Sequence, residues 1–284
     1  MNVSPIAWFT PGVLFGLLPL AVGYAWLMWG PGQEVVPGAC PPTRPQAVYF
    51  YLSLLALYAS LGSPLGVLAM GYSFTAHMFQ HMIATMAVPP LFILGIPPWL
   101  WRRLLKPRAV AFVFRHLVAP VPAIVLFNLL FAIIVIPGVI TAMVLSVPVM
   151  ILLHLLLSLF GLFMWWPMMS PVKEFPALHP ATQTLYLFAD GVLMILPLAL
   201  VALAGHFLYS AAYGSASYRV FGMPPLEDQE WGAVLCLTIV HAVYGAMVTV
   251  RIRQWAHREP ALDPELSGRA RIVPLPPYAK RLSR

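Results

Sequence analysis

Seven stretches of about 20 apolar residues constrain the fold of this chain more than any other feature. A helix of that length crosses the hydrocarbon core of a bilayer, because it rises about 1.5 Å per residue. The stretches lie at roughly 8–29, 47–68, 74–96, 110–133, 147–166, 183–209 and 231–252. Clusters of Gly and Pro, which mark turns, separate them. The sequence therefore predicts an all-α polytopic membrane helix bundle of about seven transmembrane helices.

The composition excludes a soluble fold. Of the 284 residues, 61% are hydrophobic and only 9% are charged, whereas soluble domains carry roughly 25% charged residues. No basic segment precedes the first apolar stretch, so we expect that stretch to be retained as a span and not cleaved as a signal peptide. We predict one seven-helix transmembrane domain over residues 1–255 and a basic cytoplasmic tail over residues 256–284.

The distribution of Lys and Arg residues predicts the orientation. With seven spans, fifteen of the sixteen basic residues fall on one side of the membrane, and only Arg219 falls on the other. Cytoplasmic loops are enriched in Lys and Arg, so we expect an N-out/C-in topology. The net charge of +7 is then explained by topology, with the lipid bilayer as a partner and no nucleic acid.

The motifs of common enzyme classes are absent. The sequence has no phosphate-binding glycine loop in a suitable context, no nucleophile elbow and no HExxH motif. The two cysteines, Cys40 and Cys236, form no CxxC pair, so neither a zinc site nor a thiol-redox site is indicated. We therefore predict that the protein is not an enzyme.

The uncharged third stretch contains the sequence His-Met-Phe-Gln-His-Met at residues 77–82. His77 and His81 are four residues apart and share one helix face, and Met78 and Met82 share the next face. Imidazole and thioether groups suit a soft or borderline metal, copper first. An ionisable group inside a span indicates a function by default. The motif predicts a copper site, ahead of haem, since the facing histidine pairs of a dihaem cytochrome are missing.

Two further histidines are expected at a similar depth. His154 lies about two turns into the fifth stretch, and His206 lies near the outer end of the sixth. We predict that both act as secondary metal ligands, with His241 at the limit of reach. Four sulfur-bearing side chains could extend the ligand set: Met70, Met86, Met143 and Cys236.

Packing is the alternative interpretation of these residues. A histidine on an apolar helix face is more often hydrogen-bonded within the bundle than bound to metal. Methionines at helical spacing usually fill the core, and for Met78 and Met82 taken singly packing is the favoured interpretation.

Two acidic residues have separate interpretations. Asp190 lies well inside the sixth stretch, where a carboxyl group serves either a proton path or a packing hydrogen bond to a polar neighbour. Asp228 opens the seventh stretch, and we expect it to cap the first turn of its own helix.

Proline and tryptophan residues mark further features of the bundle. Pro89 and Pro90 lack the backbone N–H that a helix interior needs, so we expect them to break the hydrogen-bond ladder of the third stretch. The tryptophans are expected to form an interfacial aromatic belt: Trp8, Trp99, Trp101, Trp165 and Trp166.

These motifs together resemble a known family. The run at 77–82, followed by Val-Pro-Pro-Leu-Phe-Ile-Leu-Gly at 88–95, resembles the signature of the CtaG-type cytochrome c oxidase assembly factors. His154 followed by Gly-Leu-Phe-Met-Trp-Trp-Pro at 161–167 is similar to the family's fifth span. Leu-Glu-Asp-Gln at 226–229, with Gly232, is similar to its entry to the last span. The resemblance covers residues from about 50 to 250.

The resemblance implies a seven-span protein of the bacterial inner membrane that helps a haem-copper oxidase to mature. Its partner would be an oxidase subunit that receives copper bound near the periplasmic face, with His77 and His81 as primary ligands. The chain departs from the family in one place, because the usual Trp-His-x-Pro before the fifth span is Ile-Val-Ile-Pro at 134–137. That missing histidine favours the alternative of an integral accessory subunit of a larger respiratory complex without its own metal, and a haem-carrying electron-transfer subunit is a third possibility.

Overall fold

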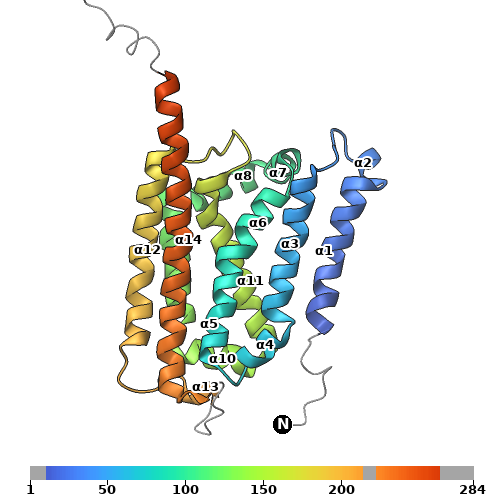
Figure 1. Ribbon diagram of the computed structural model, residues 1–284. Helices are drawn as coiled ribbons and strands as arrows, with labels where there is room; N and C mark the ends of the chain where they lie inside the picture. Colours follow the sequence, from blue (N-terminus) through green and yellow to red (C-terminus); the bar gives the residue numbers. More distant parts are fainter. Residues whose placement is uncertain (1–10, 214–221, 263–284) are drawn as a thin grey trace, which may run out of the picture.

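The computed structural model describes residues 11–213 and 222–262, and every regular element in these ranges is a helix (Figure 1). The predicted all-α fold is confirmed for this part of the chain. The elements are α1 (Pro11–Trp29), α2 (Gly32–Val35), α3 (Arg44–Leu61), α4 (Pro64–Ala69), α5 (Phe74–Met82), the π-helix η2 (Ile83–Ala87), α6 (Val88–Gly95), α7 (Pro98–Leu104), α8 (Arg108–Leu117), α9 (Pro120–Ile134), α10 (Pro137–Leu145), α11 (Val147–Met169), α12 (Pro180–Ala202), α13 (Ser210–Tyr213) and α14 (Pro225–Leu262).

Five helices in the described ranges are long and apolar enough to cross a membrane: α1, the continuous α5–η2–α6, α11, α12 and α14. The count is six if α8 and α9 form one span. The remaining predicted span lies largely in α3, whose first turn contains Arg44 and Gln46 and so lowers its mean hydropathy. The protein is thus a multi-pass membrane protein, while seven spans and the N-out/C-in topology stay predictions.

The predicted span over residues 110–133 is wrong as a single straight helix. The chain bends by 74° between α8 and α9, at Val118 and Ala119. Pro120 and Pro122 follow directly, and proline removes the backbone N–H groups that would continue α8. The helix α8 therefore lies across one end of the bundle (Figure 1), and only α9 packs along the long helices α11 and α12.

Two other predicted spans end too late. The stretch 47–68 is interrupted because Ser63 starts a new helix, its Oγ accepting a hydrogen bond from the Leu65 N–H at 3.2 Å before Pro64 enters α4. The stretch 183–209 ends at Ala202, so His206 lies in the connection after α12 and not in a span. The Gln229 side chain donates to the Val201 carbonyl there at 3.0 Å.

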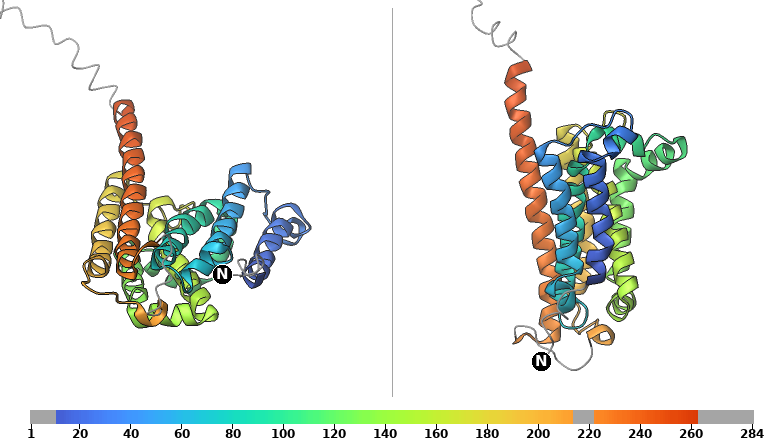
Figure 2. Two further views of the ribbon diagram at one scale, coloured as in Figure 1. Left: turned by 60° about the horizontal axis from the view of Figure 1, so that its bottom comes forward. Right: turned by 90° about the vertical axis from the view of Figure 1, so that its right-hand side faces the viewer.

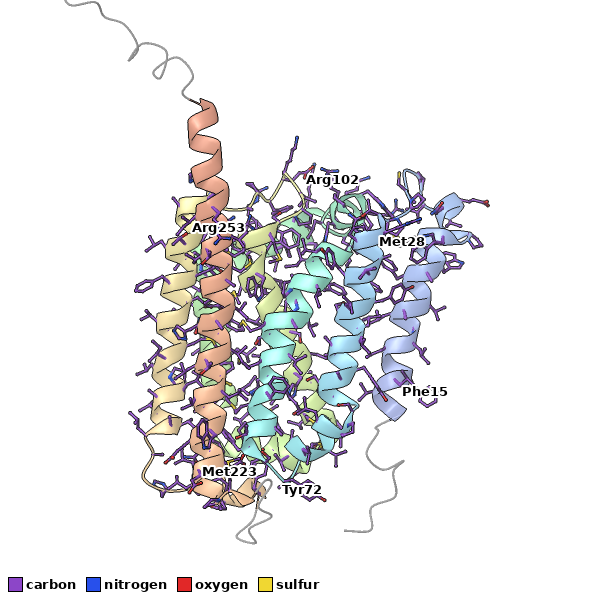
Figure 3. The ribbon with its side chains drawn as sticks, in the orientation of Figure 1. Phe15, Met28, Tyr72, Arg102, Met223 and Arg253 are labelled. Atoms are coloured by element: carbon purple, nitrogen blue, oxygen red, sulfur yellow. The ribbon has the colours of Figure 1, made fainter. Side chains whose placement is uncertain are left out.

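The long helices pack side by side, and the short ones cover the two ends of the bundle (Figures 1 and 2). The pairs with the most extensive contacts are α12 with α14, α3 with α6, α5 with α14, and α11 with α9. Arg102 and Arg253 lie at one end, called here the basic end, and Tyr72 and Met223 lie at the opposite end (Figure 3). The helix α14 continues past the predicted domain boundary at 255 to Leu262, and the rest of the predicted tail lies outside the described residues.

Candidate metal site

The structure brings three of the four predicted histidine ligands together. His77 and His81 come from α5, and His154 comes from α11. Their ring centroids are separated by 4.7 Å for His77 and His81, 5.0 Å for His81 and His154, and 5.9 Å for His77 and His154. All three side chains are 0% exposed. The expectation that His154 lies at the depth of His81 is therefore confirmed.

The hydrogen bonds of the rings leave most of their nitrogens without a partner. His77 Nδ1 lies 3.3 Å from the Ala69 carbonyl, and His154 Nδ1 lies 2.9 Å from the Met150 carbonyl. Only a protonated Nδ1 can donate to a carbonyl, so these contacts fix a tautomer in which Nε2 carries the free lone pair. Both Nε2 atoms, and both ring nitrogens of His81, are buried without a hydrogen-bond partner.

Such a set of nitrogens has the chemistry of a metal ligand set, with the outer nitrogen anchored to the backbone as in many metal sites. Phe131 lies against His81, with 6.0 Å between the ring centroids, and closes one side of the cluster with an apolar wall. In the described ranges no group of three or more His, Cys, Asp or Glu side chains is already arranged to hold a metal ion. The three rings would have to turn about their side-chain torsions before their lone pairs met at one point.

The helix that carries His77 and His81 changes its hydrogen-bond pattern just after them. The N–H of Val88 donates to the carbonyl of Ile83, five residues earlier, as in a π-helix. Pro89 and Pro90 supply no N–H, so the Thr85 carbonyl has no donor on its own helix in either the α or the π pattern. The prediction that these prolines break the ladder is confirmed.

A tryptophan from the opposite helix replaces the missing donor. Trp165 of α11 donates its Nε1–H to the Thr85 carbonyl at 2.8 Å. A Cβ added at Gly161 would lie 3.0 Å from Pro89 Cγ, so glycine allows α11 to approach this closely. Trp101, Trp165 and Trp166 are 5%, 1% and 1% exposed, so their assignment to an interfacial belt is wrong, and Trp8 lies outside the described residues. This contact ties the helix of His154 to the helix of His77 and His81.

The first turn of α5 is capped by a residue far away in the sequence. Asp228 of α14 accepts hydrogen bonds from the Phe74 N–H at 2.6 Å, the Thr75 N–H at 3.2 Å and the Ser73 hydroxyl at 2.8 Å. Ser73 Oγ in turn accepts from the Ala76 N–H at 3.1 Å. The expectation that Asp228 caps its own helix is wrong, because its carboxylate satisfies the free N–H groups of α5.

The remaining predicted ligands differ in their surroundings, and the role of Met78 and Met82 as ligands stays a prediction. Met78 and Met82 are buried in the apolar core, and the Met78 carbonyl accepts from Cys236 Sγ at 3.6 Å. His206 is exposed, and its backbone carbonyl accepts from Gln229 Nε2 at 3.4 Å. The other sulfur-bearing candidates are also core residues or pack against the core: Met70, Met86, Met143 and Cys236.

A second buried polar cluster surrounds Asp190. Asn128 of α9 donates its Nδ2–H to Asp190 Oδ1 at 2.5 Å, and Tyr244 of α14 donates its hydroxyl to Asp190 Oδ2. Sequence reasoning missed both partners. Asn128 is a lone amide in an apolar helix, and counting depths along α9 and α12 would have paired it with Asp190. His241 is exposed and belongs to neither cluster.

Comparison with known proteins gives one family. Neither the curated proteins nor the solved structures include a match to this chain. The family described as cytochrome c oxidase caa3 assembly factor (Caa3_CtaG) matches residues 22–258. That match spans every histidine, proline and tryptophan that builds the cluster at His77, His81 and His154. The chain therefore belongs to the family of cytochrome c oxidase caa3 assembly factors.

Proposed function

We propose that this protein is a non-enzymatic assembly factor that binds copper through His77, His81 and His154 and delivers it to a haem-copper oxidase subunit. The observation that carries the proposal is the set of buried imidazole nitrogens without partners. A buried polar atom without a hydrogen bond is costly and calls for an explanation, such as an ion that the group binds. Copper is here the cargo of the protein.

Imidazole chemistry supports copper as that cargo. Neutral imidazole binds copper well, and three such ligands suit a reduced copper ion that has to be released again. His81, with both nitrogens free, has the freedom to turn toward its neighbours. The edge-to-face contact of His77 and His81, with centroids 4.7 Å apart, leaves no space for a porphyrin between them, which favours copper over haem.

The position of the cluster supports exchange at one face of the membrane. His81 lies seven residues from the start of α5, and His154 lies seven residues from the start of α11. Both are thus about 10 Å along their helices from the end of the bundle opposite the basic end. If the basic end faces the cytoplasm, as the positive-inside rule requires, the cluster lies near the periplasmic face of a bacterial inner membrane.

Copper binding by the purified protein tests the proposal. The full chain in detergent would be titrated with Cu(I) against a chromogenic chelator, beside a His77→Ala/His81→Ala/His154→Ala variant. We expect wild-type protein to retain stoichiometric copper and the variant to retain none. His206→Ala is the matched control, since its exposed ring lies outside the cluster, and it should bind like wild type.

A second measurement links binding to assembly. A strain lacking the protein would be complemented with each variant, and oxidase activity would be measured in its membranes. We expect the triple histidine variant to fail and His206→Ala to succeed. A wild-type protein that binds no copper and co-purifies in fixed ratio with a respiratory complex would instead support the accessory-subunit alternative.

A further inference from the structure

Two adjacent hollows lie at the basic end of the bundle, away from the histidine cluster. One is an apolar groove of about 690 Å³ between α7, α8 and α11, which Trp101, Leu104 and Leu159 help to line. The other, of about 270 Å³, is lined by charged residues that include Arg102, Lys106 and Glu174. Leu105 lines both, so the two hollows meet at this side chain.

The helix α8 separates the two hollows by its amphipathic sequence. The side chains that it contributes to the groove recur at helical spacing: Val110, Val113, Phe114 and Leu117. From a neighbouring face of the same helix, Ala111 and Arg115 line the charged hollow. Positions three and four apart share a helix face, so α8 has one apolar and one charged side at this point. The bend of 74° from α9 holds α8 across the bundle end, at the level expected for a membrane interface.

The charged hollow has an excess of positive charge. Three cationic side chains line it, Arg102, Lys106 and Arg115, against one carboxylate, Glu174. Arg102 Nε pairs with Glu174 Oε1 at 3.0 Å, and the Arg115 guanidinium lies 5.5 Å from the centroid of the Phe175 ring. Two positive charges are therefore left without a counter-ion among the lining residues.

The groove beside it suits a hydrocarbon chain and no polar ligand. Every side chain that lines it is apolar except the indole of Trp101. The indole N–H is already donated to the Ile93 carbonyl at 3.2 Å. A peptide in this groove would lose its backbone hydrogen bonds to water without replacement, whereas an acyl chain has none to lose.

We propose that the two hollows form one binding site for an anionic phospholipid. An acyl chain lies in the groove below α8, and the phosphate group lies against Lys106 and Arg115. Basic pockets between membrane helices recognise anionic headgroups in this way. The site does not depend on the proposed copper function. It lies at the basic end, where Figure 3 labels Arg102, whereas the histidine cluster lies near the starts of α5 and α11, toward the other end of the bundle.

Native mass spectrometry of the full chain in detergent tests the proposal. The protein would be mixed with phosphatidylglycerol or with phosphatidylcholine, and retained lipid would be counted. We expect wild type to retain phosphatidylglycerol preferentially, and Lys106→Gln/Arg115→Gln to bind it roughly tenfold or more weakly. The matched control is Arg103→Gln/Arg108→Gln, which removes equal charge from exposed residues that do not line the hollow. Equal losses in the two variants, or no preference in wild type, would overturn the proposal.

Two further measurements separate the lipid from other ligands. Ala109→Trp fills the groove without changing the charge, and should weaken phosphatidylglycerol binding while Lys106→Arg/Arg115→Lys preserves it. Glycerol 3-phosphate, which has the headgroup chemistry but no acyl chain, should not displace the lipid. Displacement by glycerol 3-phosphate, or unchanged binding in Ala109→Trp, would show an anion site without a lipid groove and contradict the proposal.

Discussion

Two polar clusters are buried in the same apolar bundle, and they differ in how their hydrogen bonds are completed. Around Asp190 both carboxylate oxygens have a donor, one from Asn128 and one from Tyr244. Around His81 four imidazole nitrogens of three histidines have no partner. The first cluster connects α9, α12 and α14 through bonds that it supplies itself, although Asn128 Oδ1 is buried there without a partner. The second has the properties of a binding site, because its bonds are left for another group.

This difference bears on the two interpretations of Asp190. A proton path needs a partly solvated chain of groups. Asp190 and Tyr244 are instead buried, and the further contacts of Tyr244 and Asn128 lead to the Met164 sulfur and the Ile124 carbonyl, neither of which carries an exchangeable proton. The packing interpretation fits these contacts better, since three helices meet at one carboxyl group. We therefore expect substitutions in the two clusters to have opposite effects on stability and on copper binding.

The largest effect is expected in copper affinity. His81→Leu removes the ring that has two free nitrogens, and copper affinity should fall about 100-fold or more, since even residues that only orient ligands affect affinity by 10–100-fold. Competition with a chromogenic Cu(I) chelator measures it. Asp190→Leu should leave the affinity within about a factor of three of wild type, as additive distant sites do. Equal losses of affinity in the two variants would contradict the distinction between the clusters.

The next effect is in the free energy of unfolding without copper. Asp190→Leu leaves the Tyr244 hydroxyl and the Asn128 amide without their shared acceptor, so stability should fall by about 1–3 kcal/mol. His81→Leu removes unpaired buried nitrogens, so stability should stay equal or rise. Thermal unfolding in detergent measures both variants, and Thr238→Ala on the exposed side of α14 is the control. A loss of stability in His81→Leu as large as in Asp190→Leu would show that the histidines are structural.

A smaller effect is expected at the cap that connects α14 to α5. Asp228→Ala removes the acceptor of the Phe74 and Thr75 N–H groups, and loss of a helix cap costs about 0.5–2 kcal/mol. Because α5 carries two of the proposed ligands, copper affinity should fall as well. Glu227→Ala is the matched control, an exposed carboxylate one residue away. If the two variants unfold at the same temperature, the cap makes no measurable contribution to stability.

The smallest effect is expected at the predicted sulfur ligands. Met78→Leu conserves volume in the core, so it should cost less than about 1.5 kcal/mol and leave copper affinity unchanged. The same copper competition assay decides, with His77→Leu as the positive control. A fall in affinity close to that of His77→Leu would place the thioether among the ligands and return Met78 to the proposed site.

The depths of His81 and His154 within the bundle were predictable from the sequence, because each depends only on where its own helix starts. His81 and His154 are each seven residues from the start of a helix, and both starts are marked by residues that begin helices, Ser73 and Pro148. The prediction that His206 lies inside the sixth span was wrong. The chain after α12 is held by Gln229, which comes from another helix and could not be assigned from local signals. The bend at Val118 was missed because the mean hydropathy of residues 110–133 says nothing about direction, although Arg115, Pro120 and Pro122 in that stretch signalled a break.

The partners of the buried polar groups were not predictable by the same means. Trp165 donates to the Thr85 carbonyl across 80 residues of sequence. From the sequence, tryptophan as a residue type suggested only a position at the membrane interface. The bond exists because two prolines remove a donor on a neighbouring helix, a relation that appears only when the two helices are side by side. Asp228 was similarly assigned to its own helix, although its carboxylate binds a first turn 154 residues away.

The cap at Asp228 has a consequence for the biogenesis of the protein. The helix α5 is synthesised long before α14. Its Phe74 and Thr75 N–H groups therefore lack their acceptor until Asp228 has been translated. The helix with His77 and His81 is complete only when the last helix has been inserted. A truncated or stalled chain therefore lacks this cap of α5, and the proposed copper binding would require completion of the whole polypeptide.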